Sequence, residues 1–304
     1  MPELPDIEVY LDALRERIEG HELLGVRLGS PFLLRSVDPP VADVAGRRVT
    51  GLHRLGKRIV FELEEDLYLV LHLMIAGRLR WNEPGAKLPG KLGLAAFDFE
   101  AGSLIVTEAS KKKRASLHVV RGEKGLDEHD PGGIDPLTSN AEEFSAALRA
   151  RTHTLKRALT DPRILSGVGN AYSDEILHAA KLSPFKRTDK IDADETKRLQ
   201  LAIVQVMRDW VERLREERGD GFPVKVTAFR EEMAVHGRYG KPCPVCASPV
   251  QRLVYAANEA NYCATCQTGG KLLADRALSR LLKKDWPKSL EELEQRKKRD
   301  SQNS

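Results

Sequence analysis

The stretch MPELPDIEV at residues 1–9 predicts a helix at the start of the chain and places two chemically reactive groups directly before it. Pro5 and Asp6 predict the first turn of a helix, since proline is tolerated there and an acidic side chain suits the positive end of the helix dipole. Apolar residues then recur at helical spacing, which predicts that this helix packs on a core. These residues are Ile7, Leu11, Leu14 and Ile18.

Pro2 and Glu3 stand directly before this predicted helix. If Met1 is removed, Pro2 becomes the N-terminus and offers a free secondary amine beside the Glu3 carboxyl group. An amine can attack a sugar carbon or a carbonyl and form an imine, and a nearby acid can protonate the leaving oxygen. An N-terminal amine has a pKa near ~8 in peptides, so an appreciable fraction is neutral at neutral pH. The alternative interpretation is an ordinary frayed amino terminus.

Length and composition indicate a globular chain with room for two domains. The 304 residues carry a net charge of +4 and a sequence pI near 8.8, which is compatible with a polyanionic partner without establishing one. No apolar run reaches the ~18 residues of a membrane span, so no membrane partner is expected. The start lacks a signal segment, which favours the cytoplasm, or the nucleoid if the source is bacterial. We expect a monomer.

The region after the first helix is rich in strand-like segments bounded by Gly, Pro and acidic turns. Lys57 follows Gly56 at the entry to one strand, where it is either a solvated strand end or a functional cation. Residues 111–114 (KKKR), which include Lys111 and Lys112, form the densest basic run of this half. Four consecutive cations repel one another, so they indicate either a phosphate-facing loop or a solvated loop. The segments that predict a sheet or sandwich are 47–54, 58–63, 67–75 and 94–99.

Residues 125–140 are rich in Gly, Pro and acidic side chains and are the clearest candidate for a linker. Residues 141–215 then have a helical composition, interrupted by the glycine-rich turn SGVGN at 166–170. A glycine-rich turn that feeds a helix presents backbone N–H groups at the positive end of the helix dipole. After Gly169, Asn170 can cap that helix and also donate a hydrogen bond to a phosphate. An ordinary helical hairpin turn is the alternative.

All four cysteines lie within 24 residues, in two CxxC pairs separated by 16 residues. Their clustering indicates a metal site and not a disulfide framework. Four thiolates complete a closed tetrahedral site, which predicts one structural Zn²⁺ with no open catalytic position. Between the pairs, apolar and polar residues alternate, which predicts a β-hairpin held at its base by the metal. Redox chemistry of the thiols is the alternative to a structural metal site. The predicted ligands are Cys243, Cys246, Cys263 and Cys266.

In this order and at these separations, the motifs resemble the formamidopyrimidine-DNA glycosylase and endonuclease VIII family of base-excision repair enzymes. The motifs are PELPDIE at the start, LGKR around Lys57, DPL after the linker, GVGNAYSDEIL, and HGRYGKPCPVC with YCATCQ. The resemblance spans almost the whole chain. It implies an α+β fold of two domains: an N-terminal β-sandwich with flanking helices, then a helical domain with a helix–two-turn–helix module and a zinc-bound β-hairpin.

The resemblance also predicts how the chain is divided. The catalytic β-sandwich domain and the hinge come first, and the helical DNA-binding domain with its helix–two-turn–helix module follows. A zinc finger and a basic C-terminal extension complete the chain. The predicted bounds in that order are 1–124, 125–140, 141–235, 236–270 and 271–304.

The resemblance implies roles for individual residues. Pro2 would attack C1′ of the damaged nucleotide and displace the base, while Glu3 protonates the sugar ring oxygen. Lys57 would hold the phosphate beside the lesion and assist proton transfer. The helical module would grip the DNA backbone, and the zinc hairpin would enter the minor groove beside the flipped base. The predicted DNA-binding residues are Lys111, Lys112, Lys156, Gly169, Asn170 and Asn258.

The chain departs from the family's pattern in several places, among them two positions and one loop. Asp6 stands where the family usually has glutamate, which shortens an acid by one carbon. Asn258 replaces an arginine five residues before the third cysteine, which removes a charge and a fork of donors. The loop EASKKKR at 108–114 has no aromatic residue to fill the emptied base stack. These departures put efficient δ-elimination and tight lesion binding in doubt.

We therefore predict a bifunctional DNA glycosylase and AP lyase, acting on damaged DNA. It would remove damaged, and we expect oxidised, bases through a Schiff base on Pro2, then cut the strand by β- or β,δ-elimination. The alternative is a catalytically weakened or inactive nucleic-acid-binding protein of the same fold, which Asn258 and the missing wedge residues favour. A third interpretation makes Lys57 the imine-forming amine.

Overall fold

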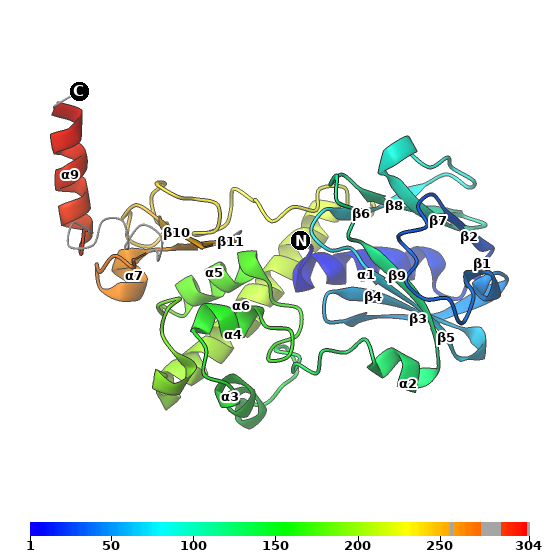
Figure 1. The fold of residues 1–304 in the computed structure, drawn as a ribbon, viewed down its shortest axis with the longest axis horizontal. Helices are drawn as coiled ribbons and strands as arrows, with labels where there is room; N and C mark the ends of the chain where they lie inside the picture. Colours follow the sequence, from blue (N-terminus) through cyan, green and yellow to red (C-terminus); the bar gives the residue numbers. More distant parts are fainter. Residues whose placement is uncertain (256–257, 275–286, 303–304) are drawn as a thin grey trace. The chain divides into compact units, whose positions relative to one another are not determined.

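The computed structural model describes most of the chain (Figure 1). Among the described residues, no helix combines the length and the apolarity needed to cross a membrane. The described ranges are 1–255, 258–274 and 287–302.

The chain forms two compact units, and each is made of two separate stretches of sequence. The sandwich unit comprises Met1–Gly133 and Met207–Ala228. The helix–hairpin unit comprises Ile134–Val206 and Phe229–Ser304. The division after Val206 falls inside helix α6 (Ala193–Arg218), so this helix belongs to both units.

Helix α1 (Leu4–Ile18) begins where the N-terminal signals predict a helix start. Glu3 is its N-cap residue, and the Asp6 carboxylate accepts a hydrogen bond from the Glu3 backbone N–H (3.0 Å). This contact fixes the backbone at Glu3, next to the predicted nucleophile. The four apolar residues of the predicted stripe are all fully buried in the core of the sandwich unit: Ile7, Leu11, Leu14 and Ile18.

Two antiparallel sheets form the rest of the sandwich unit, with strand orders β1-β3-β4-β5-β9 and β2-β7-β8-β6. Their inner faces share one apolar core with α1, in which the rings of Phe61 and Phe97 stack with centroids 5.5 Å apart. This arrangement is the predicted β-sandwich. The strands are β1 (Glu22–Leu23), β2 (Gly25–Leu28), β3 (Arg47–Leu55), β4 (Arg58–Leu63), β5 (Leu67–His72), β6 (Gly77–Asn82), β7 (Gly93–Phe99), β8 (Gly102–Glu108) and β9 (Ser116–Arg121).

The predicted strand 67–75 is three residues too long, because β5 ends at His72. The Nδ1 atom of His72 accepts a hydrogen bond from the Met74 backbone N–H (3.0 Å). The Gly77 N–H then donates to the Leu73 carbonyl (2.9 Å), so the chain turns towards β6. The other three predicted segments agree with β3, β4 and β7 to within one residue.

Short capped helices dominate the first part of the helix–hairpin unit. The Asn140 side chain accepts hydrogen bonds from the backbone N–H groups of Glu142 and Glu143 (both 2.9 Å) and so caps α3. The predicted linker 125–140 begins inside α2, and residues 128–140 connect α2 to α3 without a helix or a strand. The helices of this unit before α6 are α3 (Ala141–Arg149), α4 (Leu155–Thr160) and α5 (Asn170–Ala179), with a 3-10 turn at Thr188–Lys190. Helix α2 (Gly122–Asp127) and the 3-10 turns at Val41–Val44, Glu64–Asp66 and Gly90–Leu92 belong to the sandwich unit.

A β-hairpin and the helices α7 and α9 occupy the described residues from 251 onward. Strands β10 (Gln251–Tyr255) and β11 (Asn258–Tyr262) pair antiparallel, and α7 (Ala264–Thr268) follows. In the predicted C-terminal extension, α9 (Leu290–Gln302) begins with Leu290 and Leu293, which pack against the apolar cluster of the hairpin. The extension therefore contains a helix supported by the hairpin.

Candidate functional site

Glu3 and Lys57 form the first candidate site, within the sandwich unit. Glu3 is only 2% exposed at the start of α1, and Pro2 beside it is buried. Lys57 is half-buried in the turn between β3 and β4, where Gly56 has a φ of 64°. Burial lowers the pKa of Lys57 and the Glu3 carboxylate opposes that shift, so the two groups interact electrostatically. The structure thus brings these two predicted site residues together.

The amine at the start of the chain belongs to the same cluster. In this structure it is the amine of Met1, whose pKa is lowered by burial, raised by the Glu3 carboxylate, and lowered by the charges of Arg78 and Lys57. A lower pKa increases the fraction of neutral, nucleophilic amine at neutral pH. The Pro2 nitrogen lies in the peptide bond to Met1, so it becomes an amine only when Met1 is removed.

Sequence patterns do not identify two further members of this cluster, Arg78 and His72. The Nε atom of Arg78 donates to the Val226 carbonyl (2.6 Å). His72 ends β5 directly opposite Arg58, and burial together with the charges of Arg58 and Lys57 lowers its pKa to about 4. Its Nδ1 accepts a backbone hydrogen bond, so the neutral ring presents Nε2–H as a donor. Strand register is the only signal that could have placed His72 there.

The basic loop between β8 and β9 is shaped by a buried carboxylate. Glu108 is 1% exposed, and its Oε2 accepts hydrogen bonds from the backbone N–H groups of Arg114 (2.9 Å) and Ala115 (3.1 Å). Lys111 and Lys112 are exposed on the loop that this carboxylate closes. Their exposure agrees with both interpretations of the basic run, a phosphate-facing loop and a solvated one.

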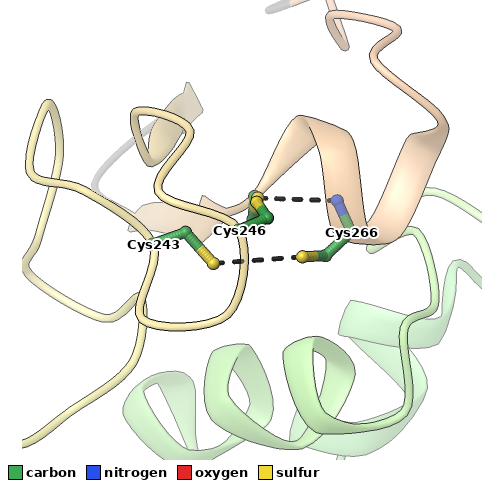
Figure 2. A group of neighbouring side chains, drawn as sticks. Cys243, Cys246 and Cys266 are labelled. Carbon is green, nitrogen blue, oxygen red and sulfur yellow. Dashed lines mark hydrogen bonds between the residues drawn. The ribbon is translucent and has the colours of Figure 1, made fainter.

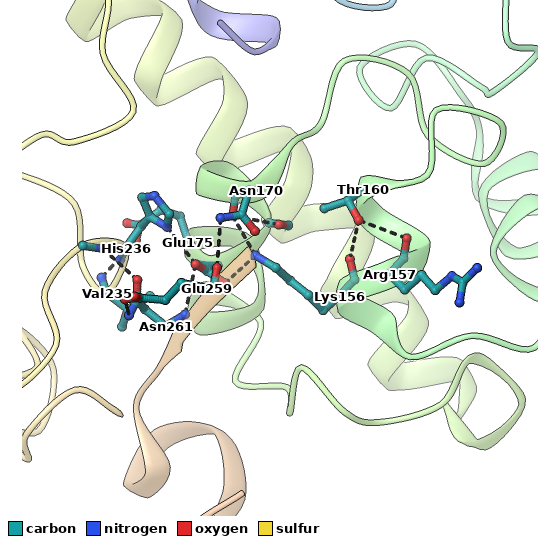
Figure 3. Close-up of polar contacts among 12 residues, drawn as sticks. Lys156, Arg157, Thr160, Asn170, Glu175, Val235, His236, Glu259 and Asn261 are labelled. Carbon is teal, nitrogen blue, oxygen red and sulfur yellow. Dashed lines mark hydrogen bonds and ion pairs between the residues drawn. The ribbon is translucent and has the colours of Figure 1, made fainter. Parts of the chain in front are cut away.

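The glycine-rich turn before α5 differs from the prediction in one respect. Gly169 is the N-cap residue of α5, so the prediction that Asn170 caps this helix is wrong. The reason is that the Asn170 side chain is engaged elsewhere, since its Nδ2 donates to the Glu259 carbonyl of the hairpin (2.9 Å; Figure 3). Asn170 therefore joins the turn to β11.

Lys156 lies on α4 with its ammonium group directed into the protein (Figure 3). It is 3% exposed, and its Nζ donates to the Asn170 carbonyl (2.7 Å) and to the Asp174 carboxylate (2.6 Å). These contacts neutralise the charge internally and hold the turn. The role of Lys156 on DNA stays a prediction.

Two adjacent carboxylates on α5 bind three segments of the helix–hairpin unit together (Figure 3). Besides Lys156, Asp174 accepts hydrogen bonds from the His236 ring (2.8 Å) and from the Asn261 backbone N–H (3.1 Å). Glu175, whose pKa is raised by burial, accepts from the backbone N–H groups of residues 234–236. Sequence patterns give no signal for this network, because an acidic pair is ordinary in a helix such as NAYSDEILHA.

The four cysteine thiols fit a structural zinc ion. Their Sγ atoms all lie within 4.8 Å of one another. The sulfurs of Cys243 and Cys266 are 3.9 Å apart (Figure 2), and those of Cys246 and Cys263 are 3.4 Å apart. A tetrahedral zinc site with Zn–S bonds of ~2.3 Å has sulfurs about 3.8 Å apart. The Nε2 atom of His178 on α5 lies 3.2 Å from the Cys243 sulfur and can orient that ligand. The ligand set is Cys243, Cys246, Cys263 and Cys266.

Asn258 is the last of the predicted DNA-binding residues. It begins β11, where it pairs with Tyr255. Its side chain and residues 256–257 lie outside the part of the chain that the structure describes. The prediction for Asn258 is therefore untested.

Comparison with known proteins agrees with this architecture. Three family descriptions match: "Formamidopyrimidine-DNA glycosylase N-terminal domain" over residues 1–116, "Formamidopyrimidine-DNA glycosylase H2TH domain" over 133–218 and "Zinc finger found in FPG and IleRS" over 240–269. A formamidopyrimidine-DNA glycosylase of Thermus thermophilus is 33% identical over 280 residues, which cover 89% of this chain and all of that protein. A Mycobacterium tuberculosis protein described as an uncharacterized formamidopyrimidine-DNA glycosylase-like protein is 42% identical over 151 residues, 50% of this chain and 94% of that one.

A solved structure shares the fold. The complex of Lactococcus lactis Fpg with DNA that contains an abasic site aligns with a TM-score of 0.76 at 23% identity, covering 88% of this chain and 99% of that one. The sandwich, the helix–two-turn–helix module and the four-cysteine hairpin define the class of DNA glycosylases of base-excision repair. The chain belongs to the formamidopyrimidine-DNA glycosylase family. The predicted family, fold and single structural zinc ion are confirmed.

Proposed function

We propose that this protein is a bifunctional DNA glycosylase and AP lyase that acts on damaged, oxidised bases through an N-terminal proline. One observation carries the proposal: the terminal amine, Glu3 and Lys57 interact electrostatically in one buried cluster. Relatives of matching length are named formamidopyrimidine-DNA glycosylases, which supports the same substrate class here.

The proposed reaction begins once Met1 has been removed. The Pro2 nitrogen forms a bond to C1′ of the damaged nucleotide while the bond between C1′ and the base breaks, and the base leaves with a proton. Glu3 donates a proton to the ring oxygen as the sugar opens to an iminium ion. The iminium ion makes the C2′ proton acidic, so its removal expels the 3′ phosphate and cuts the strand. Water then releases Pro2 from the sugar.

The electrostatics of the cluster favour these roles. Burial and the charges of Arg78 and Lys57 lower the pKa of the Met1 amine. The same surroundings would favour a neutral, nucleophilic amine on Pro2 once Met1 is removed. Glu3 is buried and held at the start of α1, beside the amine. Lys57 and the Nε2–H of His72 are donors that can hold a phosphate next to the lesion.

The competing function is a nucleic-acid-binding protein of the same fold with weakened or absent catalysis. The asparagine at position 258 and the lack of an aromatic residue in 108–114 favour it. A third interpretation keeps the enzyme but makes the Lys57 amine the nucleophile. Salt-dependent binding does not separate these functions, because all of them involve contacts to the DNA backbone.

Borohydride trapping on an abasic duplex separates them. The protein lacking Met1 should give a covalent adduct that peptide mass spectrometry locates at Pro2, together with a cut strand. A matched variant with an uncleavable residue before Pro2 should give no adduct. An adduct that persists in this variant would assign the chemistry to Lys57, and a wild-type protein that neither traps nor cuts would leave only the binding function.

A further inference from the structure

The outer face of the five-stranded sheet carries a second group of cationic and hydrogen-bonding side chains. Arg58 on β4 pairs with His72 on β5, and His118 on β9 pairs with Val70 on β5. Side chains alternate along a strand, and the neighbours Ile59, Leu71 and Leu117 lie fully buried in the sandwich core. Arg58, His72 and His118 therefore belong to the sheet face turned away from that core.

A third element brings another imidazole to this face. Helix α2 packs beside β9 and β5 (Figure 1), and His129 lies just after its end. The ring centroids of His129 and His118 are 4.4 Å apart, with the ring planes at 51°. Arg58 and both imidazoles are half-buried, so solvent still reaches them. We call Arg58, His118 and His129 the outer-face triad.

Two arginines and two carboxylates act on the outer-face triad. Burial lowers the pKa of His118 and of His129, and the charge of Arg58 lowers both further. The charge of Arg35 also lowers the pKa of His118. Two carboxylates act in the opposite direction: Asp130 raises the pKa of Arg58, and Glu128 raises that of His129.

Neither carboxylate forms a direct ion pair with the triad. Within the described ranges, no salt bridge or side-chain hydrogen bond joins Arg58, His118 or His129 to an acidic residue. A guanidinium and two imidazoles thus face one another at a half-buried surface without a bound carboxylate. An oxyanion placed among them would pair with the Arg58 charge and accept hydrogen bonds from their N–H groups.

We propose that the outer-face triad is a binding site for a phosphate group, next to the cluster of Pro2, Glu3 and Lys57 but made of other residues. The guanidinium offers a planar fork of donors that matches phosphate oxygens, and each imidazole gains a second N–H when it takes a proton. The phosphate would be a phosphodiester of the DNA strand or a free phosphate ion. Binding of a DNA phosphodiester rests on the proposed function, whereas binding of a free phosphate ion does not.

A purely structural role is the alternative. The two rings could serve only to fasten α2 to β9, with Arg58 solvated beside them. In that case neither ring would respond to phosphate, and replacing Arg58 would leave DNA binding unchanged. The two roles therefore differ in their response to ligand, and not only in stability.

The decisive measurement follows the imidazole resonances of the zinc-loaded wild-type protein by NMR. We expect the pKa values of His118 and His129 to rise when inorganic phosphate or a short abasic-analogue duplex is added, because a bound oxyanion favours the protonated rings. The wild-type protein is used with and without ligand, so His72, Arg35, Glu128 and Asp130 are present in both samples. A change in the pKa of either ring therefore reports the added ligand. If neither ligand moves either pKa, the proposal is overturned.

Variants then identify the source of the phosphate. For Arg58→Gln we expect severalfold weaker duplex binding and a plot of log affinity against log salt that is shallower by about one unit, as for one lost phosphate contact. Arg80→Gln, an exposed arginine on β6 of the other sheet, is the matched control and should leave both unchanged. If inorganic phosphate raises the pKa of the two imidazoles but Arg58→Gln binds DNA as tightly as the wild type, the site binds free phosphate and not the DNA strand.

The test also separates this inference from the proposed function. A wild-type protein that fails to cut DNA would refute the proposed function, while the phosphate titration would still decide the triad. Thermal unfolding of Arg58→Gln shows whether the variant is folded, and the wild-type titration does not depend on it.

Discussion

The substitution Asp174→Ala tests whether the buried network holds the helix–hairpin unit together. Asp174 is 1% exposed and receives the Lys156 ammonium, the His236 ring and the Asn261 backbone N–H. Its removal leaves Lys156, itself 3% exposed, as a buried charge without its carboxylate. Breaking a buried ion pair by removing one partner costs ~3–5 kcal/mol. The Asn261 N–H also loses its acceptor, so we expect about 4 kcal/mol or more.

Hydrogen exchange of the α5 amides is the suitable assay, because a chain with two units need not unfold in one transition. About 4 kcal/mol corresponds to exchange faster by about 10³-fold through local opening. The control is Asp189→Ala, which breaks the exposed pair of Asp189 with Arg187 (2.8 Å) and should leave the exchange of the α5 amides nearly unchanged.

A double variant sharpens this test. In Asp174→Leu with Lys156→Met both charges are gone, and an apolar pair of similar volume often matches or exceeds the stability of a buried ion pair. We therefore expect the double variant to be more stable than Asp174→Leu alone. The reasoning is refuted if Asp174→Ala costs under ~1 kcal/mol. It is also refuted if the stability losses of Asp174→Leu and of Lys156→Met, each measured alone, simply add in the double variant.

Three further predictions concern the sandwich unit and the metal site. For His72, with a pKa near 4 when folded, the unfolded state binds more protons between about pH 4 and 6.5, so wild-type stability should fall as the pH is lowered from 6.5 to 4, by roughly 3 kcal/mol at most. His72→Gln should flatten this slope in pH-dependent thermal unfolding, and an unchanged slope would contradict it. Cys246→Ser should lower the zinc content below one ion per chain by elemental analysis, because a closed site uses four thiolates; full occupancy would count against it. Glu108→Ala leaves the N–H groups of Arg114 and Ala115 without their acceptor, which should cost ~1–3 kcal/mol and speed tryptic cleavage in the basic loop, whereas an unaltered digest would argue against it.

Local patterns predicted the parts of the fold that local chemistry determines. The spacing of apolar residues placed α1 on the core, because a helix with such a stripe must bury it. The two CxxC pairs predicted the metal site, because each pair supplies two thiolates to one ion whatever lies between them. Asn170 shows the limit of this reasoning. Its type and position suit a cap, yet the nearby hairpin supplies an acceptor for its side chain, and no local pattern encodes that acceptor.

Contacts between distant segments decided what sequence patterns missed. His72 and Arg58 face each other because β4 and β5 pair in one register, and a shift by one residue would separate them. The acidic pair at Asp174 and Glu175 is an ordinary feature of a helix until residues 234–236 lie against it. A motif gives the type of a side chain, while its partner depends on the tertiary fold.

Lys57 and Lys156 show why this distinction matters for function. Both lysines match family motifs as cations for the DNA backbone. Lys156 donates to a carboxylate 2.6 Å away inside the protein, so its charge is already neutralised. Lys57 has no hydrogen bond or ion pair among the described residues, and its pKa is lowered by burial while Glu3 opposes the shift. A phosphate beside Lys57 would meet an unneutralised ammonium, whereas beside Lys156 it would have to displace Asp174. Of the two, Lys57 is therefore the lysine whose charge can be used by a bound strand.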